Sequence, residues 1–244
     1  MGMNIGVILA GGTGTRLGAN IPKQFIKVMG KPILAYTLEV FEKNKKIDAI
    51  EIVCHRDWVE ETENICEKYN ITKKKWICIG GETFQESAMN GILNLKGKIF
   101  EDDIVVISFG VAPMTPQEDI DDSIRVCEVH GNAVASVDID LCTCIKDNEE
   151  SSTQNIMRET LKGFANPWSF KFGELYEAYE EATRRDILNN LEPHTTSLYF
   201  ALGKRLWFSQ STAKQCKITH KSDLDIFEGS LLLKEKRERE KNDD

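Results

Sequence analysis

The 244-residue sequence lacks the patterns that mark several large classes of protein. No apolar run approaches the roughly 20 residues that cross a bilayer, and the opening MGMNIGVILAGG has no basic flank typical of a signal peptide. Lys and Arg number 31 against 39 Asp and Glu, which gives a formal net charge of −8. Because nucleic-acid polymers require a basic surface, we predict a cytoplasmic protein that binds neither membranes nor nucleic-acid polymers.

Patterns for zinc and disulfides are also missing. The seven cysteines are an odd number, Cys142 and Cys144 are only one residue apart, and the four histidines are scattered. None of these spacings is typical of a zinc site or a CxxC redox pair, so we predict reduced, structural thiols. A small anionic ligand is still compatible with the acidic balance, because a few Lys and Arg in a cleft dominate the local potential.

Short apolar runs alternate with helical patterns over the first half of the sequence. The predicted strands are residues 4–9, 49–54, 76–79, 104–108 and 133–137. The predicted helices are residues 33–43, 58–69, 84–95 and 117–130. Such alternation is typical of a mostly parallel sheet covered by helices on both faces. We therefore predict an α/β, three-layer, Rossmann-like fold.

The second half departs from this alternation. Residues 141–161 are polar with short β-prone flanks, which predicts a hairpin arm. The other predicted elements are a helix at 172–183, strands at 206–208 and 214–218, and a helix at 222–233. Residues 234–244 alternate in charge, as a solvated tail does. Without an internal repeat or linker, residues 1–244 are predicted to form one domain with this arm and tail.

A glycine-rich loop after the first strand carries the strongest chemical signal. It reads LAGGTGTRLG at residues 9–18 and is followed by PKQF at 22–25. Glycines let backbone N–H groups approach phosphate oxygens, and Arg16 and Lys23 add positive charge. The dinucleotide spacing G-x-G-x-x-G is met only loosely, and the GK[ST] ending of an ATPase loop is absent. These features predict a nucleotide-phosphate site; the alternative, a glycine turn without ligand, needs no basic partners.

Four ordered blocks resemble the nucleotide-sugar pyrophosphorylase-like transferases, and in particular the cytidylyltransferases for methylerythritol phosphate and ribitol 5-phosphate. The blocks are GGTGTRLG at 11–18, PKQF at 22–25, GGETFQES at 80–87, and QCKIT with SDL across 215–224. The resemblance implies transfer of CMP from CTP to a phosphorylated sugar alcohol, with release of pyrophosphate. It also implies Mg²⁺ as cofactor and a homodimer in which the arm crosses to the second subunit.

The same resemblance implies roles for individual residues. The positions expected to hold the nucleotide are Ala10, Gly11, Gly12, Gly14, Gly81, Glu82 and Ser87, the last three around the cytosine and ribose. The expected catalytic residues, which neutralise phosphate charge, are Arg16, Lys23 and Lys217. Arg158, on the arm, is expected to reach the acceptor phosphate.

The acceptor and metal half departs from the family pattern. Where the family carries V-H-D-x-x-R-P, this chain reads ISFGVAP at 107–113. Phe109 thus stands at a metal-binding aspartate and Ala112 at an acceptor-site arginine. The further departures are Phe84 for an arginine, TCIK at 143–146 for D-T-I-K, Asn166-Pro167-Trp168 for T-P-Q, and Pro193-His194 for a Thr-Asp pair.

These departures leave the metal ligands unassigned. A phenyl ring offers Mg²⁺ no oxygen ligand. Either the nucleotide's own phosphates and water hold the ion, or Asp103, Asp138 or Asp140 comes within reach; the alternative for these aspartates is a solvated strand end.

Two functions from different classes follow from these features. The first is a cytidylyltransferase with altered acceptor chemistry, in which Phe84, Phe109 and Trp168 make apolar contacts; for these rings, core packing is the alternative. The second is a nucleotide-binding protein that keeps the fold but has negligible turnover. A pyrophosphorylase acting on a sugar 1-phosphate is a third hypothesis, which PKQF and the block around Lys217 disfavour.

Overall fold

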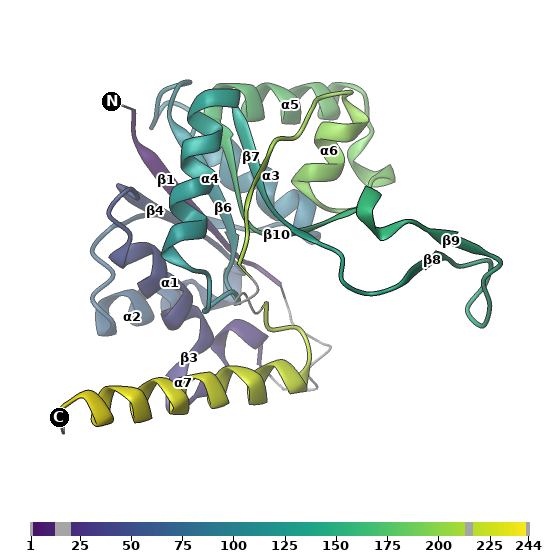
Figure 1. Ribbon diagram of the computed structural model, residues 1–244. Helices are drawn as coiled ribbons and strands as arrows, with labels where there is room; N and C mark the ends of the chain where they lie inside the picture. The colour runs from purple at the N-terminus through teal and green to yellow at the C-terminus, as the bar shows by residue number, and fades with distance from the viewer. Residues whose placement is uncertain (1, 13–20, 213–216, 243–244) are drawn as a thin grey trace.

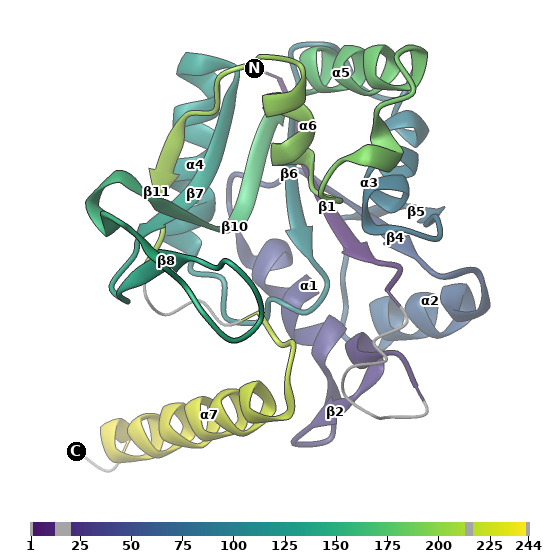
Figure 2. The same cartoon turned by 90° about the vertical axis from the view of Figure 1, so that its right-hand side faces the viewer.

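The computed structural model describes residues 2–12, 21–212 and 217–242, which form a seven-stranded sheet between two layers of helices (Figure 1). The strand order is β11-β7-β10-β6-β1-β4-β5. Neighbouring strands pair in parallel except at β10, which is antiparallel to both β6 and β7. Figure 2 shows the strands between the two helical layers. The predicted three-layer α/β fold is confirmed.

The elements have the following bounds. The strands of the main sheet are β1 (Asn4–Ala10), β4 (Ala49–Cys54), β5 (Lys74–Ile79), β6 (Ile104–Phe109), β7 (Asn132–Asp138), β10 (Lys162–Lys171) and β11 (Phe208–Gln210). The α-helices are α1 (Ile33–Lys43), α2 (Val59–Lys68), α3 (Phe84–Asn94), α4 (Gln117–His130), α5 (Phe172–Arg184), α6 (Thr195–Ala201) and α7 (Lys221–Asn242). Two small antiparallel sheets pair β2 (Lys27–Val28) with β3 (Lys31–Pro32), and β8 (Thr143–Ile145) with β9 (Gln154–Ile156).

Alternate residues of β1 face opposite sides of the sheet. Ile5 and Val7 belong to an apolar cluster with residues of α3, α5 and α6. Ile8 and Ala10 belong to the opposite cluster, with residues of α1, α2 and α4. Because both faces of this central strand are covered, its sequence is a continuous apolar run rather than an alternating one.

The largest difference from the sequence prediction is β10, a central strand where no strand is predicted. It contains the cis peptide Asn166-Pro167, and its pairing with β7 shifts register between Phe164 and Trp168. Proline has no N–H for the sheet ladder, so it normally signals an edge or irregular strand. The short helix α6 is also absent from the prediction. The late strand predicted at 206–208 lies at Phe208–Gln210, and most of the one predicted at 214–218 falls outside the described residues.

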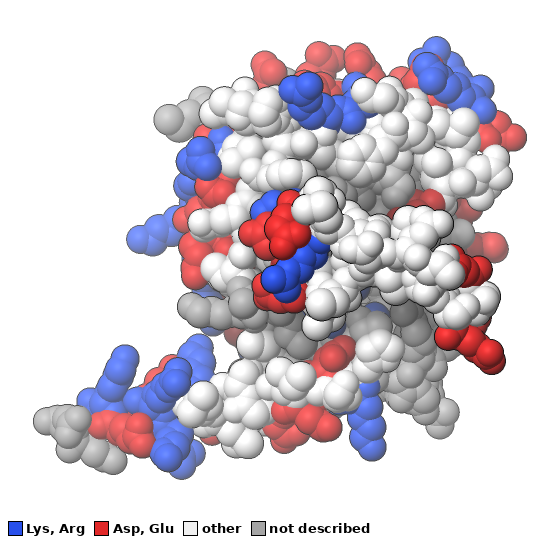
Figure 3. Space-filling model, turned by 45° about the vertical axis from the view of Figure 1, so that its right-hand side comes forward, with Lys and Arg blue, Asp and Glu red and all other residues white. Residues whose placement is uncertain are grey.

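Two elements extend beyond the sheet and its helices. The hairpin of β8 and β9 projects sideways within residues 141–161, where the sequence predicts an arm (Figure 1). Helix α7 packs Leu224, Phe227 and Leu231 against an apolar cluster that includes Val28 and Ile33. The helix continues through much of the predicted tail, and its end carries charges of both signs (Figure 3). No helix in the described part of the chain is long and apolar enough to span a bilayer.

Candidate active site

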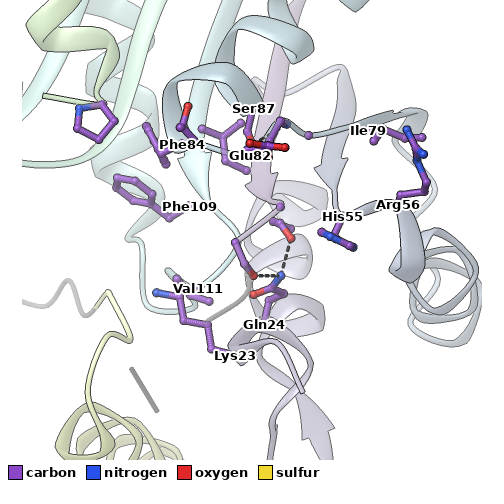
Figure 4. A pocket seen from close by; sticks show the side chains of 18 of the residues that line it. Lys23, Gln24, His55, Arg56, Ile79, Glu82, Phe84, Ser87, Phe109 and Val111 are labelled. Carbon is purple, nitrogen blue, oxygen red and sulfur yellow. Dashed lines mark hydrogen bonds between the residues drawn. The ribbon is translucent and has the colours of Figure 1, made fainter. Parts of the chain in front are cut away.

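The carboxyl ends of four adjacent parallel strands meet at one edge of the sheet. In the register, Ala10 of β1 lies beside Cys54 of β4, Cys54 lies beside Ile79 of β5, and Leu9 lies beside Phe109 of β6. The chain leaves β1 toward β4 and β5 and then returns to β6 on the other side, an arrangement that opens a crevice beyond the strand ends. A cavity of about 940 Å³ lies there (Figure 4).

The described part of the glycine loop forms one wall of this cavity. The side-chain amide of Gln24 donates to the carbonyls of Ala10, at 2.5 Å, and Gly12, at 2.9 Å (Figure 4). Gln24 is buried, so these bonds fix the path of the loop. The sequence alone does not single out Gln24, although it stands in the PKQF motif. Gly14 and Arg16 lie outside the described residues, and their roles stay predictions.

The N-terminus of α3 forms a second wall. The Thr83 hydroxyl accepts from the backbone N–H of Glu86 at 3.0 Å. The Glu86 carboxylate accepts from the backbone N–H groups of Glu82, at 2.8 Å, and Thr83, at 3.2 Å. This capping box fixes the residue at which the helix begins. The T-x-x-E spacing is visible in the sequence, so it is a signal by which this wall could be found.

Glycines at this wall allow the two segments to approach each other. The Ser87 hydroxyl accepts from the Gly81 N–H at 3.1 Å. A Cβ placed on Gly80 would lie 2.8 Å from that hydroxyl oxygen, one on Gly11 would lie 3.2 Å from it, and one on Gly81 would overlap Glu86. The predicted nucleotide-binding residues Gly11 and Gly81 therefore both lie close to the Ser87 hydroxyl.

Lys23 and Lys217 reach the same cavity from distant parts of the sequence. The Lys23 ammonium donates to the carbonyl of Ile218 at 3.3 Å. The N–H of Ile218 donates in turn to the carbonyl of Val111, just beyond β6, at 2.9 Å. The segment carrying Lys217 is thus tied both to the PKQF motif and to the sheet edge.

The other side of the cavity is aromatic. Phe84, Phe109, Trp168 and His194 form what we call the aromatic cluster. The ring centroids lie 5.4 Å apart for Phe84 and Phe109, 5.5 Å for Phe109 and Trp168, and 5.2 Å for Phe84 and His194. Figure 4 shows Phe84 and Phe109 side by side at the cavity. Phe84, Phe109 and His194 line this cavity, and the four rings pack together. Contacts of Phe84, Phe109 and Trp168 with an acceptor stay a prediction.

His194 completes the aromatic cluster as an uncharged group. Burial is the main cause that lowers the pKa of its imidazole, and the positive charge of Lys217 lowers it further. Glu192 acts in the opposite direction, with a carboxylate oxygen 3.4 Å from Nδ1. With its pKa below the usual value, the ring is neutral at neutral pH.

A second cavity, of about 430 Å³, lies on the far side of the aromatic cluster. It shares Phe109, His194 and Lys217 with the first. Asn166 also lines it, but its side chain accepts from the Phe109 N–H at 3.3 Å and donates to the Thr115 hydroxyl at 2.9 Å. The Asn166 side chain thus joins β10, β6 and the loop that precedes α4.

Arg158, the predicted acceptor residue, lies apart from the main cavity in the described part of the chain. Ala112 is buried and offers no charge at the position of the family's arginine. Arg158 donates to the carbonyl of Asp140 at 2.7 Å and lies near Glu159 in the arm. Among the described residues, it lines neither of the two cavities described above.

The aspartates considered for a metal ion lie away from the main cavity. Asp103 is buried at the start of β6, and its two oxygens accept backbone N–H groups at 2.7 and 2.8 Å. Asp138 forms an ion pair at 2.6 Å with Lys162 of β10. Neither these residues nor Asp140 lines the cavity.

The remaining residues of the site do not fit a metal anchored by side chains. Among the described residues, no three or more His, Cys, Asp or Glu side chains are grouped as metal ligands. Asp57 and Glu82 line the cavity but belong to no such group. The side chain at the end of β6 is the phenyl ring of Phe109, which has no oxygen to offer a hard cation.

Comparison with known proteins decides the family. The chain matches the family described as 2-C-methyl-D-erythritol 4-phosphate cytidylyltransferase over residues 5–232. The chain belongs to this cytidylyltransferase family. The predicted family and enzyme class, a CTP-dependent cytidylyltransferase that acts on a polyol phosphate, are confirmed.

Relatives from within the cytidylyltransferase family carry two kinds of name. The chain is 37% identical to a ribitol-5-phosphate cytidylyltransferase of Lacticaseibacillus paracasei, covering 94% of this chain and 98% of the relative. It is 30% identical to a 2-C-methyl-D-erythritol 4-phosphate cytidylyltransferase of Clostridium novyi, covering 95% and 97%. The crystal structure of 4-diphosphocytidyl-2C-methyl-D-erythritol synthase from Anaerococcus prevotii shares the fold, with a TM-score of 0.80, 20% identity, and coverage of 95% and 96%.

Proposed function

We propose that this protein transfers the cytidylyl group of CTP to a polyol phosphate, and that ribitol 5-phosphate is the first acceptor to test. The observation that carries the proposal is the joint approach of the glycine loop, the capped start of α3, Lys23 and Lys217 to one cavity. The acceptor is suggested by the name of the relative that shares 37% identity over nearly the whole chain.

The reaction needs alignment and charge stabilisation more than it needs a proton carrier. An oxygen of the acceptor phosphate attacks the α-phosphorus of CTP, and a new P–O bond forms. The bond from the α-phosphorus to the oxygen shared with the β-phosphorus breaks, and its electron pair leaves with pyrophosphate. Because the attacking oxygen is already anionic, no general base is required. The protein contributes by binding two polyanions in line and by stabilising the charge that builds up.

The residues are proposed to divide this work as follows. Backbone N–H groups of Gly11 and Gly12 bind phosphate oxygens, as a loop at the end of a buried strand can. Lys23 and Lys217, which reach the cavity from distant parts of the sequence, neutralise the phosphates. Ala10, Gly81, Glu82 and Ser87 surround the nucleoside, and Arg16 and Gly14 complete the loop.

A homodimer is part of the proposal. Arg158 lies on the arm and lines neither of the two cavities found among the described residues, so it would act on the acceptor phosphate of a second subunit. The arm also exposes Leu141, Ile145 and Met157, of which Leu141 is 78% exposed. Exposed apolar side chains gathered on one projection favour burial against another chain.

Release of pyrophosphate tests the proposed activity. The full chain would be incubated with CTP and Mg²⁺, and with ribitol 5-phosphate, 2-C-methyl-D-erythritol 4-phosphate or other polyol phosphates. We expect release with at least one acceptor and a large loss in Lys23→Met. A relative with known activity serves as the positive control. If that relative is active and this chain releases no pyrophosphate with any acceptor, the proposal is wrong.

Phe109 and Ala112 favour a second candidate, a nucleotide-binding protein with negligible turnover. Both positions have lost the charged group that the family pattern carries. If this second function is correct, CTP should raise the melting temperature of the protein. No acceptor should then yield pyrophosphate. Measurable turnover that disappears in Lys23→Met would exclude it.

A further inference from the structure

A lysine ammonium lies against the ring that stands at the family's metal-binding aspartate. Nζ of Lys217 is 3.5 Å from the centroid of the Phe109 ring. At this distance the cation is attracted to the negative face of the ring. Both residues line both cavities, so the contact lies at the boundary between the nucleotide side and the aromatic side of the site.

Both partners of this contact are held by their surroundings. The Phe109 ring packs against Phe84 and Trp168, and its backbone N–H donates to Asn166. Lys217 precedes Ile218, which is buried and bonded through its N–H to the loop after β6. The position of the ammonium therefore follows from the backbone on one side and the aromatic cluster on the other.

The chemistry of a ring and of a carboxylate at this position differs in one decisive respect. A carboxylate beside Lys217 would either bind a divalent cation or pair with the ammonium and neutralise it. A phenyl ring orients the ammonium but carries no net charge, so this contact does not neutralise the lysine. Phe109 thus excludes a metal ion anchored by a carboxylate at this position. It leaves the Lys217 ammonium as a source of positive charge.

We infer that the Lys217 ammonium, positioned by the Phe109 ring, supplies the positive charge that a carboxylate-anchored divalent cation would otherwise bring to the CTP phosphates. This inference rests on the proposed function, because it requires CTP in the main cavity. Lys217 contacts the phosphates and Phe109 is a positioning residue that acts through it. It follows that CTP binds with little dependence on divalent cations.

Calorimetric titration of CTP into the full chain tests this, with one arm in EDTA and one in Mg²⁺. For the unaltered protein we expect the two dissociation constants to agree within about threefold, which is small beside what a phosphate-bridging metal contributes. Phe109→Asp restores the carboxylate, so Mg²⁺ should tighten its CTP binding by about tenfold or more. Complexation of CTP by Mg²⁺ in solution is common to all variants and cancels when their Mg²⁺ effects are compared.

Three further variants separate position from charge. Lys217→Met should weaken CTP binding about tenfold in both arms, since a charge-assisted contact to phosphate is lost. Phe109→Leu keeps apolar bulk but removes the ring, and should weaken binding about two- to fivefold in both arms. Phe109→Tyr keeps the ring and should bind as the unaltered protein does. Thermal melts establish that each variant is folded.

The outcomes distinguish this inference from the proposed function. If Mg²⁺ tightens CTP binding to the unaltered protein as strongly as to Phe109→Asp, the inference is overturned even where pyrophosphate is released. Binding by Lys217→Met in EDTA that equals that of the unaltered protein also overturns it. The second result does not depend on whether Phe109→Asp folds. A Mg²⁺ effect of about tenfold or more on the unaltered protein would overturn the inference without that variant. Absence of CTP binding in every arm would contradict the proposed function itself.

Discussion

The two sides of the cavity are built from different kinds of group. On the nucleotide side, the glycine loop and the capped start of α3 present backbone and small side chains, held by Gln24 and Ser87. On the aromatic side, Phe84, Phe109 and Trp168 pack ring against ring. The first depends on close backbone approach, which most side chains would block. The second depends on side-chain identity and can change while the backbone stays the same.

This difference explains how one half of the site matches the family while the other departs from it. Phe109 ends a strand whose register with β1 continues up to that residue, so the substitution leaves the pairing of β6 intact. A Cβ on Gly81, by contrast, would overlap Glu86 and disturb the cap of α3. A change at Phe109 therefore alters the chemistry of the site and leaves the strand pairing intact, whereas a side chain at Gly81 would also alter the structure.

The largest effect is expected for Trp168→Ala on the aromatic side. The side chain is buried in the main apolar cluster, and Nε1 donates to the Ala165 carbonyl at 2.6 Å. We expect a loss of about 3–5 kcal/mol in the free energy of unfolding, as for other buried aromatic truncations. Urea denaturation measures it, and calorimetry should show nearly unchanged CTP affinity under native conditions. A loss of CTP affinity of about tenfold, as expected for Lys217→Met, would remove the distinction between the two sides.

Lys23→Met should have the next largest effect, on turnover. We expect the rate of pyrophosphate formation to fall about hundredfold or more, because a cation that stabilises developing phosphate charge is lost. The ammonium donates to the Ile218 carbonyl at the cavity edge, and loss of a single hydrogen bond of this kind should change stability by about 1 kcal/mol. Lys27→Met, an exposed lysine on the neighbouring β2, is the matched control. Equal effects of the two substitutions would show that net charge, rather than the site, is responsible.

The contribution of Glu51, which links β4 to α3 on the nucleotide side, to the free energy of unfolding should depend on pH. Glu51 of β4 is buried, one oxygen accepts from Asn94 of α3 at 2.5 Å, and burial raises the pKa of its carboxyl from 4.5 to about 7. Because the folded state holds the proton more tightly, this group favours folding below about pH 4.5. That contribution is lost as the pH rises to about 7. In the unaltered protein this loss should lower the free energy of unfolding as the pH rises, by on the order of 2 kcal/mol, given 1.36 kcal/mol for each pKa unit. We expect Glu51→Gln to lack this decline.

Urea denaturation at pH 5 and pH 8 measures this decline in the free energy of unfolding. Glu67→Gln, at an exposed position of α2, controls for the loss of a surface charge. An equal pH dependence in the unaltered protein and in Glu51→Gln would assign the decline to other groups.

Many features of the two sides can be predicted from the sequence, and those that cannot have physical reasons. The ends of β1, β4 and β6 follow from apolar runs bounded by glycine or polar residues, and the glycine blocks point to the nucleotide side. Strand β10 escapes prediction because Asn166-Pro167 interrupts its pattern. The contact of Lys217 with Phe109 joins residues more than a hundred positions apart, and no local pattern encodes it. Gln24 escapes notice because its function is to bond to backbone carbonyls, which leave no mark in the sequence.

The smallest effect, and the finest test of the comparison, is expected for Thr83→Ala. The substitution removes the hydroxyl that caps α3 and should cost about 1 kcal/mol of stability, as other N-caps do. Thr83→Ser keeps the hydroxyl and should behave as the unaltered protein in urea denaturation. The cap also sets the path of Gly81 and Glu82, so its loss should weaken CTP binding as well. We expect the affinity to fall about twofold, which is a smaller free-energy change than the loss of stability. If Thr83→Ala loses stability but keeps its full CTP affinity, the start of α3 supports the fold without shaping the nucleotide side.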